Sequence, residues 1–89
     1  MKSRRHPDFR EAYARLPKEV RAQAKRAYDL FKQDPYHNSL YFKQVDPVDP
    51  VFSVRIGRSY RALGIKRGDA IIWFWIGHHS EYDKILSQL

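Results

Sequence analysis

The chain has 89 residues, of which 43% are hydrophobic and 15% aromatic, which is enough for one core and leaves no room for a second domain. Seventeen lysines and arginines oppose ten acidic residues, and the formal charge of +7 favours a polyanionic partner such as nucleic acid, the ribosome or an acidic protein segment. Because cysteine is absent, the sequence excludes disulfides, thiolate metal sites and cysteine nucleophiles.

The first residues, MKSRRHPDF, are basic and lack the apolar segment of a signal peptide, so we expect a cytoplasmic protein. Residues 1–7 are short and highly charged, which predicts a flexible arm rather than a strand. Without a strand at this point, one edge of the sheet would be open to a second chain.

Two amphipathic helices are predicted next. Apolar residues recur at intervals of four and three at Phe9, Tyr13 and Leu16, and Pro17 both ends this short helix and begins the next. The second helix extends to about Gln33 and carries apolar residues on one face and basic residues on the other. That basic face is either a solvated surface or a further contact for nucleic acid or an acidic partner. With almost no linker, the two helices form a helical hairpin.

Four strands are predicted after the hairpin, at residues 40–45, 51–57, 60–65 and 70–76. Residues 51–57 alternate between apolar and polar, so Arg55 should point away from the apolar layer. The run AIIWFWI is too short to cross a bilayer and is typical of a central strand, with Trp73 and Trp75 in the core. A short final helix is predicted from Ser80 onward.

This order predicts an α+β fold in one domain, residues 1–89. The N-terminal helical hairpin would pack on one face of a small, mainly antiparallel four-stranded sheet, and a short C-terminal helix would follow. The opposite face of the sheet would be concave. We expect Arg55, Arg61 and one imidazole to converge on a single hollow on that face.

The sequence resembles the RelE/ParE superfamily of toxins from bacterial toxin–antitoxin systems. The resemblance covers the chain from Phe9 onward and rests on three stretches in order: ARLPKEVRAQAKRAYDLFKQDPYHNSLYFKQV, VFSVRIGRSYRAL, and IGHH followed by Tyr82. It implies a helical hairpin on a small antiparallel sheet. For many members it implies ribosome-dependent cleavage of mRNA without a metal or other cofactor, and neutralisation by an antitoxin, here expected to be acidic, that wraps around the toxin. Other members act on DNA gyrase and have no nuclease chemistry.

The resemblance also implies roles for individual residues. Arg61 matches the position that holds the scissile phosphate in the nuclease branch, and Arg55 matches a basic strand position that faces the RNA. His78 and His79 match the basic residues that follow the last strand. Tyr82 lies near the position of a C-terminal tyrosine, although its spacing from the histidines is shorter than the family pattern.

The residue types agree with this chemistry. Cleavage of RNA without a metal requires a group to deprotonate the 2′-OH, a group to protonate the leaving oxygen, and cations to stabilise the phosphate charge. His78 or His79 can transfer protons near neutral pH, and arginine can hold a phosphate bidentately. Adjacent residues of an extended chain point to opposite sides, so at most one of the two histidines should face the site, and the pair should not bind a metal.

Arg58 and Tyr60 complete the candidate RNA-binding set. Arg58 is either a phosphate contact or simply a turn residue, and Tyr60 either stacks on a base or packs beside Arg58. The favoured function is therefore an mRNA endonuclease toxin that represses translation. The alternative is a non-catalytic binding protein of the same fold, either a gyrase-inhibiting toxin or an inactive orphan relative.

Overall fold

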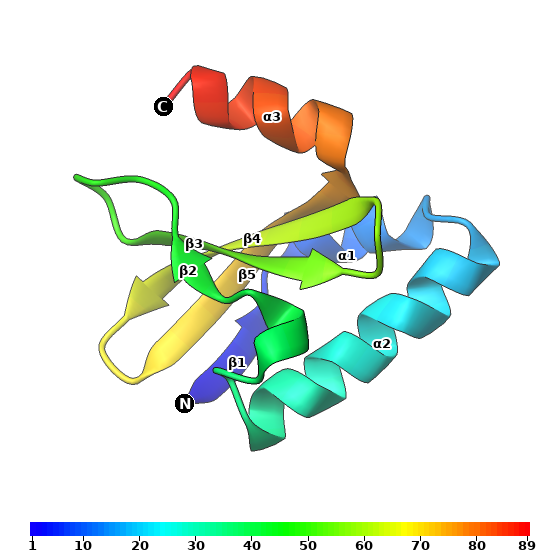
Figure 1. The fold of residues 1–89 in the computed structure, drawn as a ribbon, viewed down its shortest axis with the longest axis horizontal. Helices are drawn as coiled ribbons and strands as arrows, with labels where there is room; N and C mark the ends of the chain where they lie inside the picture. Colours follow the sequence, from blue (N-terminus) through cyan, green and yellow to red (C-terminus); the bar gives the residue numbers. More distant parts are fainter.

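A five-stranded mixed sheet lies between two helical layers in the computed structural model, which describes all 89 residues (Figure 1). The strand order is β1-β5-β4-β3-β2, in which β1 runs parallel to β5 and every other pair is antiparallel. The strands are β1 (Lys2–Arg5), β2 (Lys43–Gln44), β3 (Val51–Ile56), β4 (Tyr60–Arg67) and β5 (Ala70–His78). The helices are α1 (Pro7–Ala14), α2 (Lys18–Gln33) and α3 (His79–Ser87), with a 3₁₀ turn η1 (Asn38–Leu40). The predicted α+β architecture is confirmed.

The helical hairpin packs on one face of the sheet, as predicted. Phe9 of α1 and Ala24 and Phe31 of α2 are buried against Val54 and Ile56 of β3. Side chains alternate between the two faces along β3, so Phe52, Val54 and Ile56 all lie on the face that the hairpin covers. In Figure 1, α2 lies on one side of the sheet and α3 on the other.

The central position of β5 is also confirmed, because β5 has a neighbour along each edge. A register shift between Leu63 and Gly64 pairs Leu63 with Trp75 and Gly64 with Trp73, so that Phe74 is the extra residue of a β-bulge. The two tryptophans therefore face opposite layers. Trp73 lies in the core beneath the hairpin, whereas Trp75 is half-buried beside the smaller core of Val51, Leu63 and Tyr82 under α3.

The N-terminal segment differs from its prediction. Instead of a flexible arm, Lys2–Arg5 forms β1, whose register places Ser3 opposite Ile71 of β5. The Trp73 Nε1 donates to Ser3 Oγ at 2.9 Å, and the Tyr28 hydroxyl donates to the Ser3 carbonyl at 3.2 Å. The predicted flexible arm and open sheet edge beside β5 are therefore wrong. The prediction failed because an edge strand that exposes lysine and arginine carries no apolar alternation.

The predicted strand at residues 40–45 is confirmed only at two positions. Only Lys43–Gln44 forms β2, and Leu40, at 2% exposure, ends the 3₁₀ turn as a buried residue. Tyr41 follows in the left-handed region with φ of 48°, which interrupts an extended backbone. The sheet thus has five strands instead of four, and the last helix begins one residue earlier than predicted, at His79. None of the helices combines the length and apolar composition needed to cross a bilayer.

Candidate functional site

Two of the predicted phosphate-binding residues are direct neighbours across two strands. Arg55 of β3 lies opposite Arg61 of β4, on the face of the sheet away from the helical hairpin. The Arg61 Nη1 donates to the Tyr60 carbonyl at 2.8 Å and approaches the Arg58 carbonyl at 3.5 Å. Neither Arg55 nor Arg61 belongs to any of the ion pairs in the structure. The structure therefore brings together two cationic side chains without an acidic partner.

The β3–β4 turn brings Arg58 towards α2. Gly57 opens the turn with φ of +58°, a conformation that favours glycine. A Cβ at Gly57 would lie 2.6 Å from the Gln23 side-chain oxygen, so the turn passes close to α2. Arg58 is exposed beside it and lines a cleft of about 500 Å³ together with Arg55, Arg26 and Tyr41.

Tyr60 and His78 form a second group, on the opposite face. They are partners in the β4–β5 register, and their rings meet edge to face with centroids 5.4 Å apart. Tyr60 pairs with Ile56 and with His78, so these three residues share the hairpin face of the sheet. Arg55 and Arg61 are one position away along their strands and therefore lie on the other face. Tyr60 and His78 both line a cleft of about 650 Å³ that also contains acidic residues of α1 and α3, namely Asp8, Glu11 and Glu81. His78 therefore lies on the opposite face of the sheet from Arg55 and Arg61 and is not the imidazole expected to share a hollow with them.

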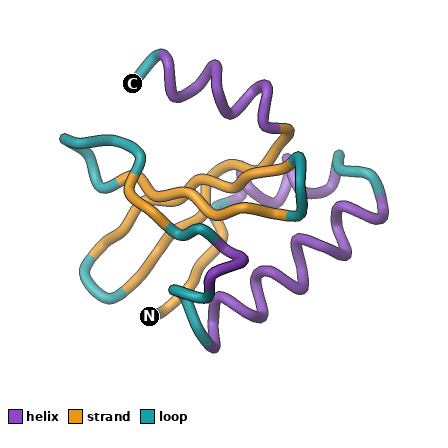
Figure 2. The backbone as a smooth tube through the Cα atoms, in the orientation of Figure 1, coloured by secondary structure: helices purple, strands orange, loops and turns teal.

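The two imidazoles nevertheless lie close together, with ring centroids 4.4 Å apart. Alternation of adjacent residues fails at this point because the chain passes directly from β5 into α3, as Figure 2 shows. His78 is the N-cap of α3, and its Nδ1 accepts a hydrogen bond from the Ser80 backbone N–H at 3.2 Å. The His79 Nδ1 lies 3.8 Å from the Asp83 Oδ2, one helical turn along α3. The first turn of α3 thus orients both rings.

His79 is also tied to the β3–β4 turn. Its backbone N–H donates to the Ser59 carbonyl at 2.8 Å, next to the Arg58 carbonyl that Arg61 approaches. Arg58, Arg61 and His79 therefore gather around one end of the sheet. This end is formed by the β3–β4 turn and the start of α3, and it contains two of the predicted arginines and one of the predicted histidines.

Tyr82 occupies a different environment from the other candidates. It is 8% exposed between α3 and the sheet, and its hydroxyl donates to Ser53 Oγ at 3.1 Å. Ser53 is itself 2% exposed, so the bond is enclosed by the core. The structure supports a structural role for Tyr82, which satisfies a buried serine.

Sequence reasoning overlooked three residues beside the candidates. Asp83 follows His79 by four positions, and this helical spacing was the signal that could have identified it. Arg26 belongs to the basic face of α2, but nothing in the sequence distinguishes it from its basic neighbours. Tyr41 gave no signal, because a tyrosine in an expected strand does not indicate a left-handed backbone.

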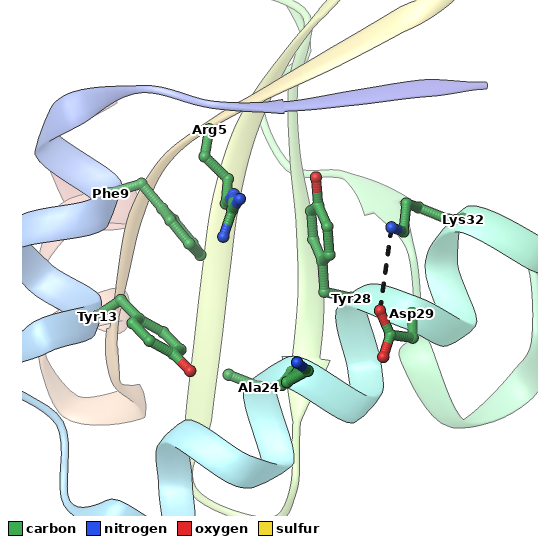
Figure 3. A pocket seen from close by; sticks show the side chains of 8 residues that line it. Arg5, Phe9, Tyr13, Ala24, Tyr28, Asp29 and Lys32 are labelled. Carbon is green, nitrogen blue, oxygen red and sulfur yellow. Dashed lines mark ion pairs between the residues drawn. The ribbon is translucent and has the colours of Figure 1, made fainter.

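A further cleft, of about 310 Å³, lies between β1 and the helical hairpin (Figure 3). The Tyr28 ring stands between two cations, with the Arg5 guanidinium 5.2 Å and the Lys32 ammonium 5.0 Å from its centroid. Lys25 also lines the cleft, and the acidic residue there, Asp29, approaches Lys32 at 4.0 Å. The cleft therefore combines a net positive charge with aromatic walls. No group of three or more histidine or acidic side chains is arranged to hold a metal ion anywhere in the chain.

Solved toxin structures share this fold. The toxin–antitoxin complex RelB–RelE from Methanococcus jannaschii matches with a TM-score of 0.73 and 20% identity, over 91% of this chain and 96% of that one. The RelBE2 complex from Mycobacterium tuberculosis matches with a TM-score of 0.67 and 20% identity, over 86% of this chain and 95% of that one. Isolated RelE from Escherichia coli matches with a TM-score of 0.64 and 14% identity, over 96% of this chain and 97% of that one. At these identities the likeness establishes the fold alone.

The sequence itself matches the profile of the ParE-like toxin domain over residues 18–84. A search of curated proteins finds no significant match. The matched region runs from the start of α2 into α3, and includes Arg55, Arg61, His78 and His79. Because the profile covers most of the chain and the whole fold agrees with it, this protein belongs to the ParE-like toxin domain family of the RelE/ParE superfamily.

Proposed function

We propose that this chain is a RelE-like toxin, a ribosome-dependent, metal-independent mRNA endoribonuclease that represses translation in the cytoplasm. The observation that carries the proposal is the Arg55–Arg61 pair, two guanidinium groups on directly opposed residues with no acidic partner. Like charges directly opposite each other on paired strands destabilise the sheet. A bound phosphodiester would convert that repulsion into two charge-assisted contacts.

His79 would supply the proton transfers: it would take the 2′-OH proton and, as the resulting imidazolium, return it to the leaving oxygen. His78 lies on the face opposite Arg61, and its Nδ1 already accepts the Ser80 N–H, so it would position the start of α3 instead. The Asp83 carboxylate favours a proton on the His79 Nδ1, which leaves the His79 Nε2 free to accept the 2′-OH proton. Arg61 would hold the phosphate between these two steps and stabilise its developing charge. Arg58, at the same end of the sheet, would contact the flanking backbone.

Tyr60 would orient His78 through the edge-to-face contact of the two rings. Tyr82 has no catalytic part in this proposal, because its hydroxyl is enclosed and already bonded to Ser53.

The partner in this proposal is a cognate acidic antitoxin, in keeping with the complexes formed by RelE toxins of similar fold. The cleft between β1 and the hairpin is suited to such a partner. Arg5, Lys25 and Lys32 outnumber Asp29 there, and the rings of Tyr13 and Tyr28 give apolar contact area (Figure 3).

A second candidate is a non-catalytic toxin of the same fold that inhibits DNA gyrase. It is favoured by the separation of Arg55 and Arg61 from Tyr60 and His78 on opposite faces of the sheet, and by the burial of Tyr82. Under this alternative the arginines would bind a protein or DNA surface without chemistry on phosphorus.

Arg61→Ala tests the proposal in a purified translation reaction that contains a defined mRNA. We expect mRNA cleavage, read by primer extension, to fall about 10- to 100-fold, because a charge-assisted phosphate contact is lost. Arg67→Ala is the matched control: it removes an exposed arginine from the same strand, at the opposite end, and should cleave as the wild type does. Circular dichroism would establish that both variants are folded.

The same preparations separate the two candidates. If the wild-type chain leaves the mRNA intact on translating ribosomes yet blocks DNA supercoiling by gyrase, the nuclease proposal is wrong and the alternative holds. If Arg61→Ala cleaves as fast as Arg67→Ala, the arginine pair is not the phosphate site.

A further inference from the structure

We propose that the cleft between α2, η1 and the β3–β4 turn binds one nucleotide of a single-stranded RNA beside the scissile phosphate. The base would stack on Tyr41, and Arg26 and Arg58 would contact the adjoining phosphate. This inference rests on the proposed RNA-cleaving function and adds a subsite to it.

The cleft is concave and carries only positive charge. It has a volume of about 500 Å³, and three of its lining side chains are arginines, contributed by α2, β3 and the β3–β4 turn (Arg26, Arg55 and Arg58). No acidic residue lines it, and none of the three arginines belongs to an ion pair. Packing these charges around a hollow is unfavourable unless an anion occupies it.

Local structure directs the arginines into this cleft. Gln23, Arg26 and Leu30 follow one another at helical spacing along the side of α2 that lines the cleft. Gly57 of the β3–β4 turn lies close to Gln23 on that side, and Arg58 of the turn lines the same cleft as Arg26. The opposite wall is the 3₁₀ turn with Ser39 and Leu40.

Tyr41 supplies the aromatic surface. The residue is 59% exposed, and its backbone occupies the left-handed region, with φ of 48° and ψ of 42°. This conformation is costly for a bulky residue, and such strain is concentrated at functional sites. The Arg55 guanidinium lies 5.1 Å from the centre of the ring, an arrangement that pairs an aromatic face with a phosphate-binding group. An exposed ring in an arginine-lined cleft fits a stacked base.

The cleft also continues from the proposed phosphate site. Arg55 lines the cleft and lies opposite Arg61, so it belongs to both. An RNA strand held at Arg61 would therefore pass Arg55 on its way to Tyr41. The chemistry favours RNA over an acidic peptide, because a peptide carboxylate needs the arginines but does not use an exposed ring.

The test is equilibrium binding of a short fluorescein-labelled single-stranded RNA with 2′-O-methyl groups, which cannot undergo 2′-OH attack. Tyr41→Ala should weaken binding about 5- to 150-fold, the range measured for loss of one stacked base, whereas Tyr41→Phe should bind as the wild type does. Arg26→Ala should weaken binding and reduce the slope of log affinity against log salt by about 0.7, the value for one phosphate contact.

Two matched controls are available. Tyr36→Ala removes another exposed tyrosine outside the cleft, and Lys25→Ala removes the basic residue next to Arg26 that faces a different cleft. Equal losses for Tyr41→Ala and Tyr36→Ala, or for Arg26→Ala and Lys25→Ala, would overturn the subsite. So would Tyr41-dependent binding of oligoglutamate that is tighter than the binding of RNA.

Because the probe cannot be cleaved, the subsite and the nuclease function can fail separately. Loss of affinity in Tyr41→Ala with no cleavage by the wild type would retain the RNA subsite and reject the catalysis. Normal cleavage by the wild type together with unchanged affinity in Tyr41→Ala would retain the catalysis and reject the RNA subsite.

Discussion

Replacement of Tyr82 by alanine should lower the free energy of unfolding by about 3–5 kcal/mol, the usual cost of removing a buried aromatic side chain. Tyr82 is enclosed with Val51 and Leu63 in the smaller core, which joins α3 to the sheet. A protein of this size has only about 5–15 kcal/mol of stability, so α3 should detach or the whole chain should unfold at moderate denaturant concentration. Chemical denaturation followed by tryptophan fluorescence measures the effect.

Tyr82→Phe separates the structural role from a catalytic one. It keeps the ring but leaves Ser53 Oγ without its partner, which should cost about 1–3 kcal/mol. The double variant Ser53→Ala, Tyr82→Phe removes both polar groups and should recover most of that loss. Cleavage per folded molecule should equal that of the wild type in both variants. If Tyr82→Phe instead cleaves much more slowly while its stability is unchanged, Tyr82 takes part in catalysis.

Deletion of residues 2–5 should destabilise the protein by about 2–6 kcal/mol, because buried Trp73 and half-buried Tyr28 lose their hydrogen-bond partners at once. Trp73 Nε1 would lose Ser3 Oγ, and the Tyr28 hydroxyl would lose the Ser3 carbonyl. The deletion would also expose the backbone of β5, an apolar strand that then forms a sheet edge. Self-association through that edge is therefore expected, and analytical ultracentrifugation would show an increase in solution mass.

The control for this deletion is the double substitution Lys2→Ala, Arg4→Ala. It removes two exposed charges from β1 and leaves the Ser3 contacts and the backbone pairing in place. We expect its stability and mass to match those of the wild type. If the deletion variant is as stable and as monomeric as this control, β1 contributes nothing and the N-terminal segment behaves as a free arm.

The site was predictable only in part, and the reason lies in strand register. The pairing of Arg55 with Arg61 follows from a tight turn between two alternating strands, so local spacing was sufficient to bring them together. The same alternation puts Tyr60 and His78 on the other face, so His78 is not the imidazole that was expected to lie with the two arginines. The sequence shows which residues of a single strand share a face. Only the pairing between β4 and β5 shows which face of one strand continues into which face of the other.

Local patterns determined most of the architecture. The 3.6-residue spacing of apolar side chains identified α1 and α2, the alternation in β3 identified its buried face, and the continuous apolar run identified β5 as a central strand. These features depend on neighbours within a few positions, so the chain itself records them. The order of these stretches along the chain also identified the family.

Tertiary structure decided what depends on distant partners. Lys2–Arg5 becomes a strand because β5 offers an unpaired edge nearly 70 residues later in the chain, and Trp73 provides a donor for Ser3. Tyr82 is buried because Ser53 lies beneath α3, and Tyr41 turns left-handed where Leu40 enters the core. In each case a polar group or an apolar side chain must be satisfied by a residue far along the chain, and no local pattern specifies that residue.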